Sequence, residues 1–387
     1  MRDVFIIGSK GIPAAYGGFE TFVDNLVSYQ KNREIKYHVA CITGQEREYA
    51  YEGAHCFVVP VPNIGPAKAV YYDIAAFRYC IQYIKRHKCQ KPIVYVLACR
   101  IGPFIGTLKH ALDRLGGTLL VNPDGHEWLR AKWNYAIRKY WKLSERLMVK
   151  HAKLLVCDSL NIEDYIQKEY KKYQPKTTYI AYGASVEETQ AENISERAKQ
   201  WYELHGIYPK QYYLIVGRFV PENNYELMIT EFMHSDSQCD LVIVTNVEQN
   251  KFYHTLQEKT DFEKDKRIRF VGTVYDQELL AEIRRNAVAY IHGHAVGGTN
   301  PSLLEALAAT QVNLLYDVGF NREVAEEAAY YFTGEAGSMQ NAMLRIEALS
   351  DDERKEIEQK AKTRIRLAFS HERIVNLYER LFTEIGR

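Results

Sequence analysis

The sequence predicts two doubly wound α/β domains of the Rossmann-like kind, each built around a parallel sheet. The chain has 387 residues, which is more than one ordinary domain holds. Short apolar segments bounded by Gly, Pro, Asn and Asp recur along it. Most of these segments are continuously apolar rather than alternating, which is typical of strands buried on both faces. Stretches with helical spacing separate many of them, as repeated β-α units require.

The expected elements follow the chain in order. In the first half the expected strands are Val4–Ile7, His38–Ile42, Cys56–Val59, Ile93–Leu97, Leu119–Val121, Leu154–Cys157 and Thr178–Ile180. In the second half they are Tyr212–Val216, Leu241–Val244, Ile268–Val271, Ala289–Ile291, Val312–Tyr316 and Ala329–Phe332. Apolar residues at helical spacing mark helices over Phe19–Gln30, Tyr225–Phe232, Gln277–Asn286, Pro301–Ala309 and Asp351–Ile385.

The domain boundary is expected between residues 182 and 210, because Gly183–Arg197 is polar and acid-rich and carries no strand pattern. This gives an N-terminal domain over 1–183 and a C-terminal domain over 184–387, whose last helix, about 366–387, is a candidate to pack back on the first. Ligands of open α/β sheets bind at the carboxyl ends of the strands. The cleft between two such domains is therefore the expected active site.

Composition excludes several classes of protein. Apolar residues make up 47% and charged residues 26%, which argues against disorder and coiled coil. No apolar run approaches the roughly 18 residues of a membrane span, and the N-terminus lacks the apolar core of a signal peptide. The seven cysteines are odd in number and form no C-x-x-C pair, so we expect a reducing, cytoplasmic location without disulfides or structural zinc.

Charge is distributed unevenly. Residues 1–183 carry 27 Lys/Arg and 16 Asp/Glu, a balance of +11, and residues 184–387 carry 23 and 33, a balance of −10. Residues 130–153 alone hold eight Lys/Arg against one acid, with Trp133, Tyr135, Tyr140 and Trp141 interleaved at helical period. Such a helix favours an anionic membrane surface, although its aromatics could instead pack into the domain. Nucleic acid is not expected as a partner.

Two loops of the first domain are candidate sites. Gly8–Glu20 places glycines after the first strand, with Gly17 and Gly18 where a helix N-terminus favours an anion and Glu20 as either a helix cap or an acceptor-side ligand. It matches neither the P-loop nor the dinucleotide fingerprint. Asn122–Trp128 concentrates Asp124, His126, Glu127 and Trp128 after a strand. These side chains can grip sugar hydroxyls, move a proton and stack on a sugar face.

Two loops of the second domain suit a diphosphate. Arg218 follows a glycine at a strand end and can bind phosphate bidentately, while Asn223 and Asn224 could cap the next helix. His292–Ala306 begins with a glycine-rich loop, Gly298 included, and Thr299 or Asn300 then caps a helix with Pro301 in its first turn. Glu305 could hold a ribose diol. His292 and His294 have no third ligand at useful spacing, so no metal site is expected.

Together these motifs resemble glycosyltransferase family 4, whose members have the GT-B fold of two Rossmann-like domains. The resemblance is carried by GIPAAYGGFE, NPDGHEW, GRFVPENN and GGTNPSLLEA and spans nearly the whole chain. More narrowly, the chain is similar to bacterial β-1,4-rhamnosyltransferases of streptococcal capsule and rhamnan synthesis. The resemblance implies an N-terminal acceptor-binding domain and a C-terminal nucleotide-sugar-binding domain.

The resemblance also implies roles for single residues. Gly17 and Gly18 match the glycine loop that faces the donor phosphates and the acceptor, and Arg218 matches the diphosphate-binding arginine. Gly298, Thr299 and Asn300 match the loop at the diphosphate, and Glu305 matches the second glutamate of E-x7-E, which holds the donor ribose. His126 lies near the family's N-domain histidine, with Asp124 and Glu127 as alternatives. Two positions depart from the family pattern, Gly297 for the first glutamate and Asn223 for the usual lysine.

The implied reaction is transfer with retention of configuration, without metal, from dTDP-β-L-rhamnose to a lipid-diphosphate-linked sugar at the inner membrane face. The alternatives are a family 4 transferase using another UDP- or GDP-sugar and a catalytically silent scaffold of a polysaccharide assembly complex. An NAD(P)-dependent oxidoreductase is disfavoured because G-x-G-x-x-G is absent. The sequence gives no oligomeric state.

Overall fold

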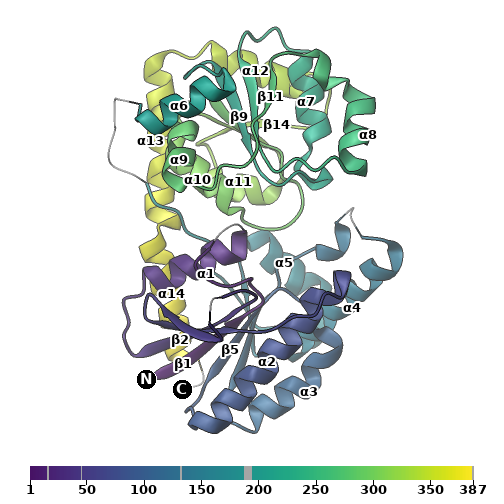
Figure 1. Cartoon of the computed structure of the whole chain (residues 1–387), viewed down its shortest axis with the longest axis vertical. Helices are drawn as coiled ribbons and strands as arrows, with labels where there is room; N and C mark the ends of the chain where they lie inside the picture. Colours follow the sequence, from purple (N-terminus) through teal and green to yellow (C-terminus); the bar gives the residue numbers. More distant parts are fainter. Residues whose placement is uncertain (15–16, 45, 131–132, 187–193, 386–387) are drawn as a thin grey trace. The chain divides into compact units, whose positions relative to one another are not determined.

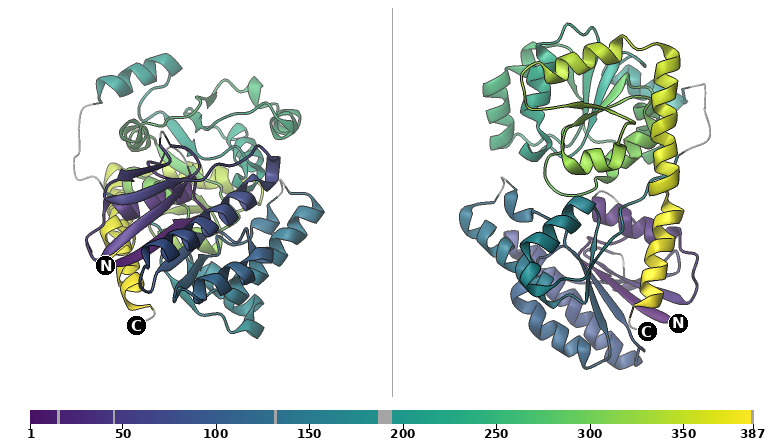
Figure 2. Two further views of the ribbon diagram at one scale, coloured as in Figure 1. Left: turned by 60° about the horizontal axis from the view of Figure 1, so that its bottom comes forward. Right: turned by 180° about the vertical axis from the view of Figure 1, so that it is seen from behind.

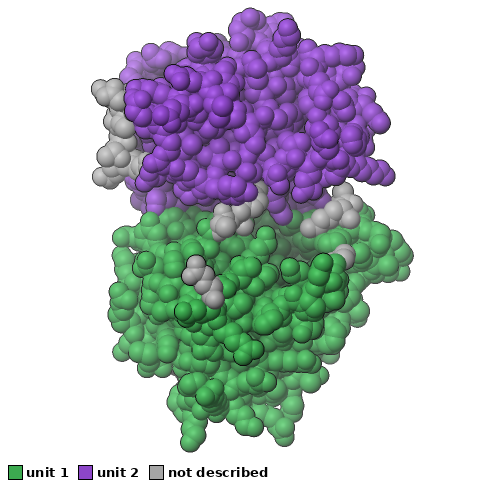
Figure 3. Space-filling model, in the orientation of Figure 1, with its two compact units in different colours: residues 1–183, 297–299, 371–387 green, residues 184–296, 300–370 purple. Residues whose placement is uncertain are grey.

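The computed structural model describes residues 1–14, 17–44, 46–130, 133–186 and 194–385. The chain divides into two compact units (Figure 3). Unit 1 comprises residues 1–183, 297–299 and 371–387, and unit 2 comprises residues 184–296 and 300–370. Part of the segment expected to connect the domains, residues 187–193, lies outside the described residues.

Unit 1 contains an eight-stranded sheet in the order β3-β4-β2-β1-β5-β6-β7-β8. Its strands pair in parallel, except that β3 and β4 are antiparallel. The strands are β1 (Arg2–Ile7), β2 (Ile35–Cys41), β3 (Glu48–Tyr51), β4 (Ala54–Val58), β5 (Ile93–Leu97), β6 (Thr118–Asn122), β7 (Leu154–Cys157) and β8 (Thr177–Tyr179).

Helices cover both faces of this sheet (Figures 1 and 2). They are α1 (Gly18–Ser28), α2 (Lys68–His87), α3 (Gly102–Asp113), α4 (Tyr135–His151), α5 (Leu160–Glu169) and α14 (His371–Glu384), with short 3₁₀ turns η1 (Gly65–Ala67), η2 (Glu127–Leu129) and η3 (Lys171–Tyr173). Because successive strand residues face opposite ways, Phe5 and Val94 pack toward the α2 side. Tyr37 and Tyr95 instead meet Phe382 of α14.

Unit 2 contains a six-stranded, fully parallel sheet in the order β11-β10-β9-β12-β13-β14. The strands are β9 (Tyr212–Val216), β10 (Asp240–Val244), β11 (Ile268–Phe270), β12 (Ala289–His292), β13 (Asn313–Tyr316) and β14 (Tyr330–Phe332). Every residue of β9 from Tyr212 to Ile215 is buried, which explains why the strand is continuously apolar.

The helices of unit 2 also lie on both faces of its sheet (Figure 1). They are α6 (Glu196–His205), α7 (Tyr225–Met233), α8 (Lys251–Thr260), α9 (Gln277–Arg285), α10 (Pro301–Ala309), α11 (Gly319–Ala325), α12 (Ser338–Glu347) and α13 (Asp351–Arg364), with turns η4 (Pro221–Asn223), η5 (Phe262–Lys264) and the π-helical η6 (Ile365–Phe369). One core joins the sheet to α7, α8 and α12, and the other joins it to α6, α9 and α10.

The predicted fold class is confirmed, and two local expectations are wrong. The short edge strand β3 was not expected, because Glu48–Tyr51 is half-exposed and lacks an apolar run. The helix expected over Asp351–Ile385 is not continuous. Its π-helical turn ends at Phe369, and the extended backbone of Ser370 (φ −63°, ψ 142°) separates it from α14. The two helices that result fall in different units, since α14 belongs to unit 1.

In each sheet the strand order reverses at one place. In unit 2 the chain winds outward from β9 to β10 and β11 and then returns to add β12 on the other side of β9. In unit 1 the same reversal lies between β1 and β5. At such a point the loops leaving two neighbouring strands diverge and open a crevice at their carboxyl ends. The loops after β9 and β12, and after β1 and β5, are therefore the positions that the fold offers for ligands.

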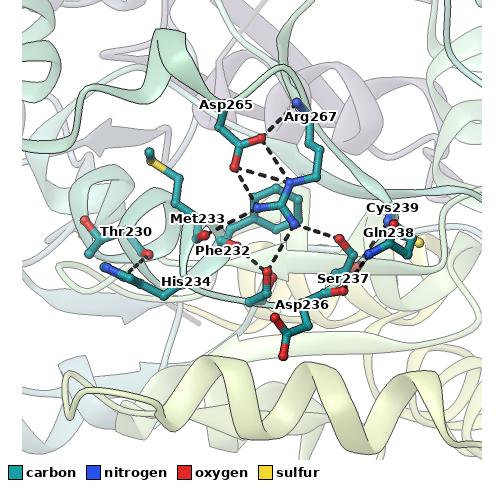
Figure 4. Close-up of polar contacts among 11 residues, drawn as sticks. Thr230, Phe232, Met233, His234, Asp236, Ser237, Gln238, Cys239, Asp265 and Arg267 are labelled. Carbon is teal, nitrogen blue, oxygen red and sulfur yellow. Dashed lines mark hydrogen bonds and ion pairs between the residues drawn. The ribbon is translucent and has the colours of Figure 1, made fainter.

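Away from the carboxyl ends of the strands, Arg267 stabilises the connection between α7 and β10 (Figure 4). Its guanidinium binds both oxygens of Asp265 and donates to the carbonyls of Ser235 and Ser237 at 3.1 and 2.6 Å. It also lies 4.8 Å above the ring of Phe232. The hydrogen bonds from Arg267 hold the pKa of Asp265 below its ordinary value, so this arrangement is charged at neutral pH.

Replacing Arg267 with Met should lower the free energy of unfolding by about 1–3 kcal/mol, because several carbonyls and a carboxylate lose their donor. Arg269→Met is the matched control. Arg269 is more exposed, and among the described residues its side chain pairs with Asp240 alone, at 3.6 Å, so its loss should cost about 0.5 kcal/mol or less. Urea unfolding of both variants measures the difference, and equal effects would contradict the structural role of Arg267.

Candidate functional site

Arg218 stands at the reversal point of unit 2, directly after β9 and Gly217. Its side chain is exposed, and within the part of the chain that the structure describes it makes no hydrogen bond or ion pair. Its own carbonyl accepts from the side chain of Asn223 at 2.7 Å and from the backbone N–H of Val220 at 2.9 Å. The backbone is thus fixed while the guanidinium remains available for an anion.

Asn223 joins the loops that follow β9 and β12. Besides donating to the Arg218 carbonyl, it lies with Oδ1 2.8 Å from Nδ1 of His294. Asn224 adds a second link by donating to the Gly293 carbonyl at 2.9 Å. The alternative in which these asparagines only cap the next helix is wrong. Asn224 occupies the N-cap position of α7, but its amide is committed to Gly293 and makes no capping bond.

The N-terminus of α10 is capped by Asn300, whose Oδ1 accepts the N–H of Ser302 at 2.9 Å. Thr299, the alternative cap, is buried instead and donates its hydroxyl to the Asp158 carbonyl at 2.5 Å. Gly298 packs against the same aspartate, because a Cβ there would lie 2.2 Å from Asp158 Oδ1. Gly298 and Thr299 therefore fix the loop within unit 1, while Asn300 begins the helix in unit 2.

Glu305 lies on α10 with 31% of its side chain exposed. Its Oε2 is 2.7 Å from Nη2 of Arg284, an arginine of α9 that is only 3% exposed. Sequence reasoning missed Arg284. The signal was an arginine on the apolar face of α9, next to Ile283 and one turn from Leu280, both of which are buried.

His292 ends β12 and is almost fully buried. Its Nδ1 lies 3.2 Å from the Tyr290 hydroxyl, and its Nε2 has no hydrogen-bond partner among the described residues. Burial lowers the pKa of His292 to about 3, so the ring is neutral near pH 7. The described residues contain no group of three or more His, Cys, Asp or Glu side chains placed to hold a metal ion.

In unit 1 the glycine loop after β1 is tied down by carboxylates of α1. Glu20 is buried and accepts the N–H of Lys10 at 2.6 Å, and Asp24 accepts the N–H of Ala14 at 2.6 Å. Gly17 has φ +135°, and a Cβ there would lie 1.9 Å from Glu20 Oε2, so only glycine fits. Gly18 is exposed at the first residue of α1. Ala15 and Tyr16 of this loop lie outside the described residues.

The loop after β6 brings Asp124 and Glu127 to one arginine. Nε of Arg130 is 2.5 Å from Glu127, and its Nη2 is 3.9 Å from Asp124. Trp133 also donates to Glu127, at 2.9 Å. Both carboxylates therefore lie within ion-pair distance of Arg130.

The other two side chains of this loop pack against Tyr165 of α5. The ring centroid of His126 lies 4.1 Å from that of Tyr165, and Trp128 donates to the Tyr165 hydroxyl at 3.3 Å. Burial lowers the pKa of His126, which favours the neutral ring that a proton acceptor needs. Beneath it, Tyr165 donates to the buried Glu145 at 2.5 Å.

Lys142 completes this cluster instead of contributing to an exposed basic surface of the helix. Its ammonium donates to Tyr165 at 2.7 Å, pairs with Glu169 at 2.9 Å and lies 4.5 Å from the Trp128 ring. Trp141 is buried, and Tyr140 donates its hydroxyl to the Arg100 carbonyl at 2.8 Å. Most aromatics of residues 130–153 thus pack into the domain.

The exposed surface of α4 is nevertheless basic, through Arg138, Lys139, Arg146 and Lys150, with Tyr135 and Leu143 as its large exposed apolar side chains. Ala131 and Lys132 lie outside the described residues. Among the helices that the structure describes, none has the length and apolar character needed to cross a bilayer.

Arg100 stands at the reversal point of unit 1, shortly after β5, and was also missed. It donates to the Gly8 carbonyl at 2.7 Å and lies 3.2 Å from Asp73, a fully buried residue of α2. Burial raises the pKa of Asp73 to about 6, and the charge of Arg100 opposes that rise. The pair anchors the start of the glycine loop to α2. The sequence signal for this pair was Asp73, the one acidic residue of α2.

Two families match parts of the chain. Residues 1–185 match a domain of unknown function (DUF1972), and residues 198–366 match Glycosyl transferases group 1. Comparison with curated proteins gives no match.

Solved structures cover the whole chain. A sucrose-phosphate synthase from Thermosynechococcus elongatus is 14% identical with a TM-score of 0.77, covering 99% of this chain and 100% of that one. An α,α-trehalose-phosphate synthase (UDP-forming) from Burkholderia xenovorans is 11% identical with a TM-score of 0.75, covering 99% and 100%. Anabaena HepE, in complex with UDP, is 12% identical with a TM-score of 0.69 and covers 100% of both chains. The fold is GT-B, and the group 1 match supports a GT-B glycosyltransferase.

Buried His292 should make stability depend on pH. Its folded-state pKa of about 3 lies below the ordinary 6.5, so unfolding takes up a proton below pH 6.5. The stability that it contributes is present above pH 6.5 and is lost as the pH falls toward 3. Between pH 7 and pH 5 the wild type should lose about 2 kcal/mol more than His292→Phe, as measured by urea unfolding. Parallel pH profiles of the two proteins would contradict this assignment.

Proposed function

We propose that this chain, which carries a group 1 glycosyltransferase domain on a GT-B fold, transfers L-rhamnose from dTDP-β-L-rhamnose to a lipid-diphosphate-linked sugar, with retention of configuration and without a metal ion. The donor side of the proposal rests on Arg218, an exposed arginine at the reversal point of the unit 2 sheet whose side chain has no partner among the described residues. An arginine so placed suits a diphosphate, which a Rossmann-like sheet binds at this edge.

The rest of the donor site is built from the same edge. The N-terminus of α10 offers N–H groups and the positive end of the helix dipole to phosphate. Glu305, on the same helix, would accept a hydroxyl of the nucleotide pentose. Asn223, which replaces the family's usual lysine, holds the Arg218 loop in place instead of supplying charge. Arg218 and the backbone therefore carry the neutralisation of the leaving diphosphate.

Sequence resemblance to streptococcal-type rhamnosyltransferases supports rhamnose as the sugar and a lipid-linked acceptor. A second candidate donor is a UDP-sugar. The Burkholderia relative is described as UDP-forming, and the Anabaena relative is in complex with UDP. Both candidates use the same Arg218 site and differ in the base, the pentose and the transferred sugar.

In the proposed reaction the acceptor hydroxyl oxygen forms the new bond to the anomeric carbon as the bond to the donor diphosphate breaks. A leaving phosphate oxygen takes the hydroxyl proton, so no covalent glycosyl-enzyme is formed and both bonds lie on one face of the sugar. The loop with Asp124, His126 and Glu127 would orient the acceptor or the donor sugar. Arg130 holds both carboxylates, and His126 is the neutral member of the loop.

Arg218→Ala should lower the transfer rate by at least about 10²-fold, the scale of one preorganised electrostatic contact with a leaving group. Arg269→Ala, which removes a half-exposed arginine from β11 of the same unit, is the control and should retain the wild-type rate. Product formation from dTDP-rhamnose and a lipid-linked acceptor measures both. Near-normal turnover by Arg218→Ala would remove the proposed donor site.

The acceptor proposal also places the protein peripherally on the inner face of the membrane, through the exposed basic surface of α4. Changing Arg138, Lys139, Arg146 and Lys150 to Glu should abolish co-sedimentation with anionic phosphatidylglycerol vesicles, since each cation near such a surface contributes about 1 kcal/mol. Wild-type binding should also weaken at high salt.

The control makes the same change in charge at exposed lysines of unit 2, namely Lys251, Lys264, Lys355 and Lys360. It should still bind the vesicles. If both quadruple variants sediment as the wild type does, α4 is only a solvated face and the acceptor is reached in another way.

A further inference from the structure

Arg284 is buried beneath Glu305, where α9 and α10 lie side by side (Figure 1). Its Nη2 is 2.7 Å from Glu305 Oε2 and 3.3 Å from Ser302 Oγ. Ser302 Oγ lies 3.1 Å from the Tyr290 hydroxyl, which donates to the Val216 carbonyl at 3.1 Å. The guanidinium is therefore fixed by a network that ends on β9, two residues before Arg218.

This contact occupies one side of the Glu305 carboxylate. Arg284 competes for the lone pairs of Oε2 and fixes the rotation of the carboxyl group. Oε1 has no partner among the residues that the structure describes, and the side chain is partly exposed. Arg284 Nε is buried without a hydrogen-bond partner in the same part of the chain, so no second carboxylate balances this guanidinium. Glu305 therefore offers one unoccupied oxygen to a ligand.

The number of unoccupied oxygens matters for the pentose. A ribonucleotide presents two adjacent hydroxyls, at its 2′ and 3′ carbons, and a carboxylate with both oxygens unoccupied can accept from both. A 2′-deoxyribonucleotide presents only the 3′ hydroxyl, which one oxygen satisfies.

We infer that Arg284 is a positioning residue that sets the pentose specificity of the donor site. By engaging Glu305 Oε2 it leaves a single acceptor, so that a 2′-deoxyribonucleoside diphosphate binds as well as its ribose counterpart. The inference rests on the proposed function, in which Glu305 meets the pentose of a nucleotide sugar. Beyond the proposed function, the inference states how the site treats two nucleotides that differ only in the 2′ hydroxyl group.

The test compares the binding of dUDP and UDP by titration calorimetry, because these two nucleotides differ only in the 2′ hydroxyl. The wild type should bind both with Kd values within about threefold of each other. In Arg284→Met both oxygens of Glu305 become available. The ratio of the Kd for dUDP to the Kd for UDP should then rise by about tenfold, the value of one hydrogen bond to a charged group. Arg269→Met, at an arginine remote from Glu305 in the contacts described, should keep the wild-type ratio.

Because the ratio is measured within one preparation, partial loss of folded protein does not change it. Arg284→Lys, which keeps the charge, should restore a ratio close to that of the wild type and serves if the Met variant does not fold. A wild-type preference for UDP of about tenfold or more, or an unchanged ratio in Arg284→Met, would overturn the inference alone. Failure of the wild type to bind either nucleotide would overturn the proposed donor site and the inference with it.

Discussion

The reversal of strand order between β9 and β12 is the constraint on which the proposed donor site depends. Parallel strands end at one edge of a sheet, and only where the winding direction changes do two neighbouring loops diverge. Arg218 follows one of these strands, and Gly293 follows the other. The asparagines at 223 and 224 then hydrogen-bond across the two loops and hold them in place. The position of the proposed site is thus a consequence of topology, and the side chains there would determine what binds.

A second property of this edge is its dependence on buried polar contacts. Arg284, Ser302 and Tyr290 connect α9, α10 and β12 to the last carbonyl of β9. Each contact places a donor or acceptor where burial would otherwise leave it unsatisfied, so the network is costly to disturb. In unit 1 the pair Arg100 and Asp73 does the same for the start of the glycine loop. Both units therefore fix a strand end with an arginine held by a carboxylate.

The sequence was most informative where the type of a residue and of its immediate neighbours in the chain indicates its environment in the fold. Burial on both faces makes β5, β7 and β9 continuously apolar, and the predicted ranges of these three strands agree with the structure in every residue. Arg218 could be found because a glycine and a strand end precede it. The edge strand β3 escaped prediction because half-exposed strands carry a weak pattern.

Residues whose role depends on a distant partner could not be found in this way. Arg100 and Asp73 are 27 positions apart, and Arg284 meets Glu305 only because two helices pack together. Lys142 illustrates the opposite error. It was expected on a basic surface, but α4 turns it toward Tyr165 and Glu169, and helical spacing alone does not show which cations face inward.

A transfer assay in the presence of EDTA, with dTDP-β-L-rhamnose and a lipid-diphosphate-linked sugar, tests the central claim most directly. The proposed site, with Arg218 and the α10 N-terminus neutralising the diphosphate, predicts that rhamnose is transferred without a divalent metal and that NMR of the product shows retained anomeric configuration. Loss of all transfer in EDTA, restored by Mg²⁺, or a product of inverted configuration would contradict it.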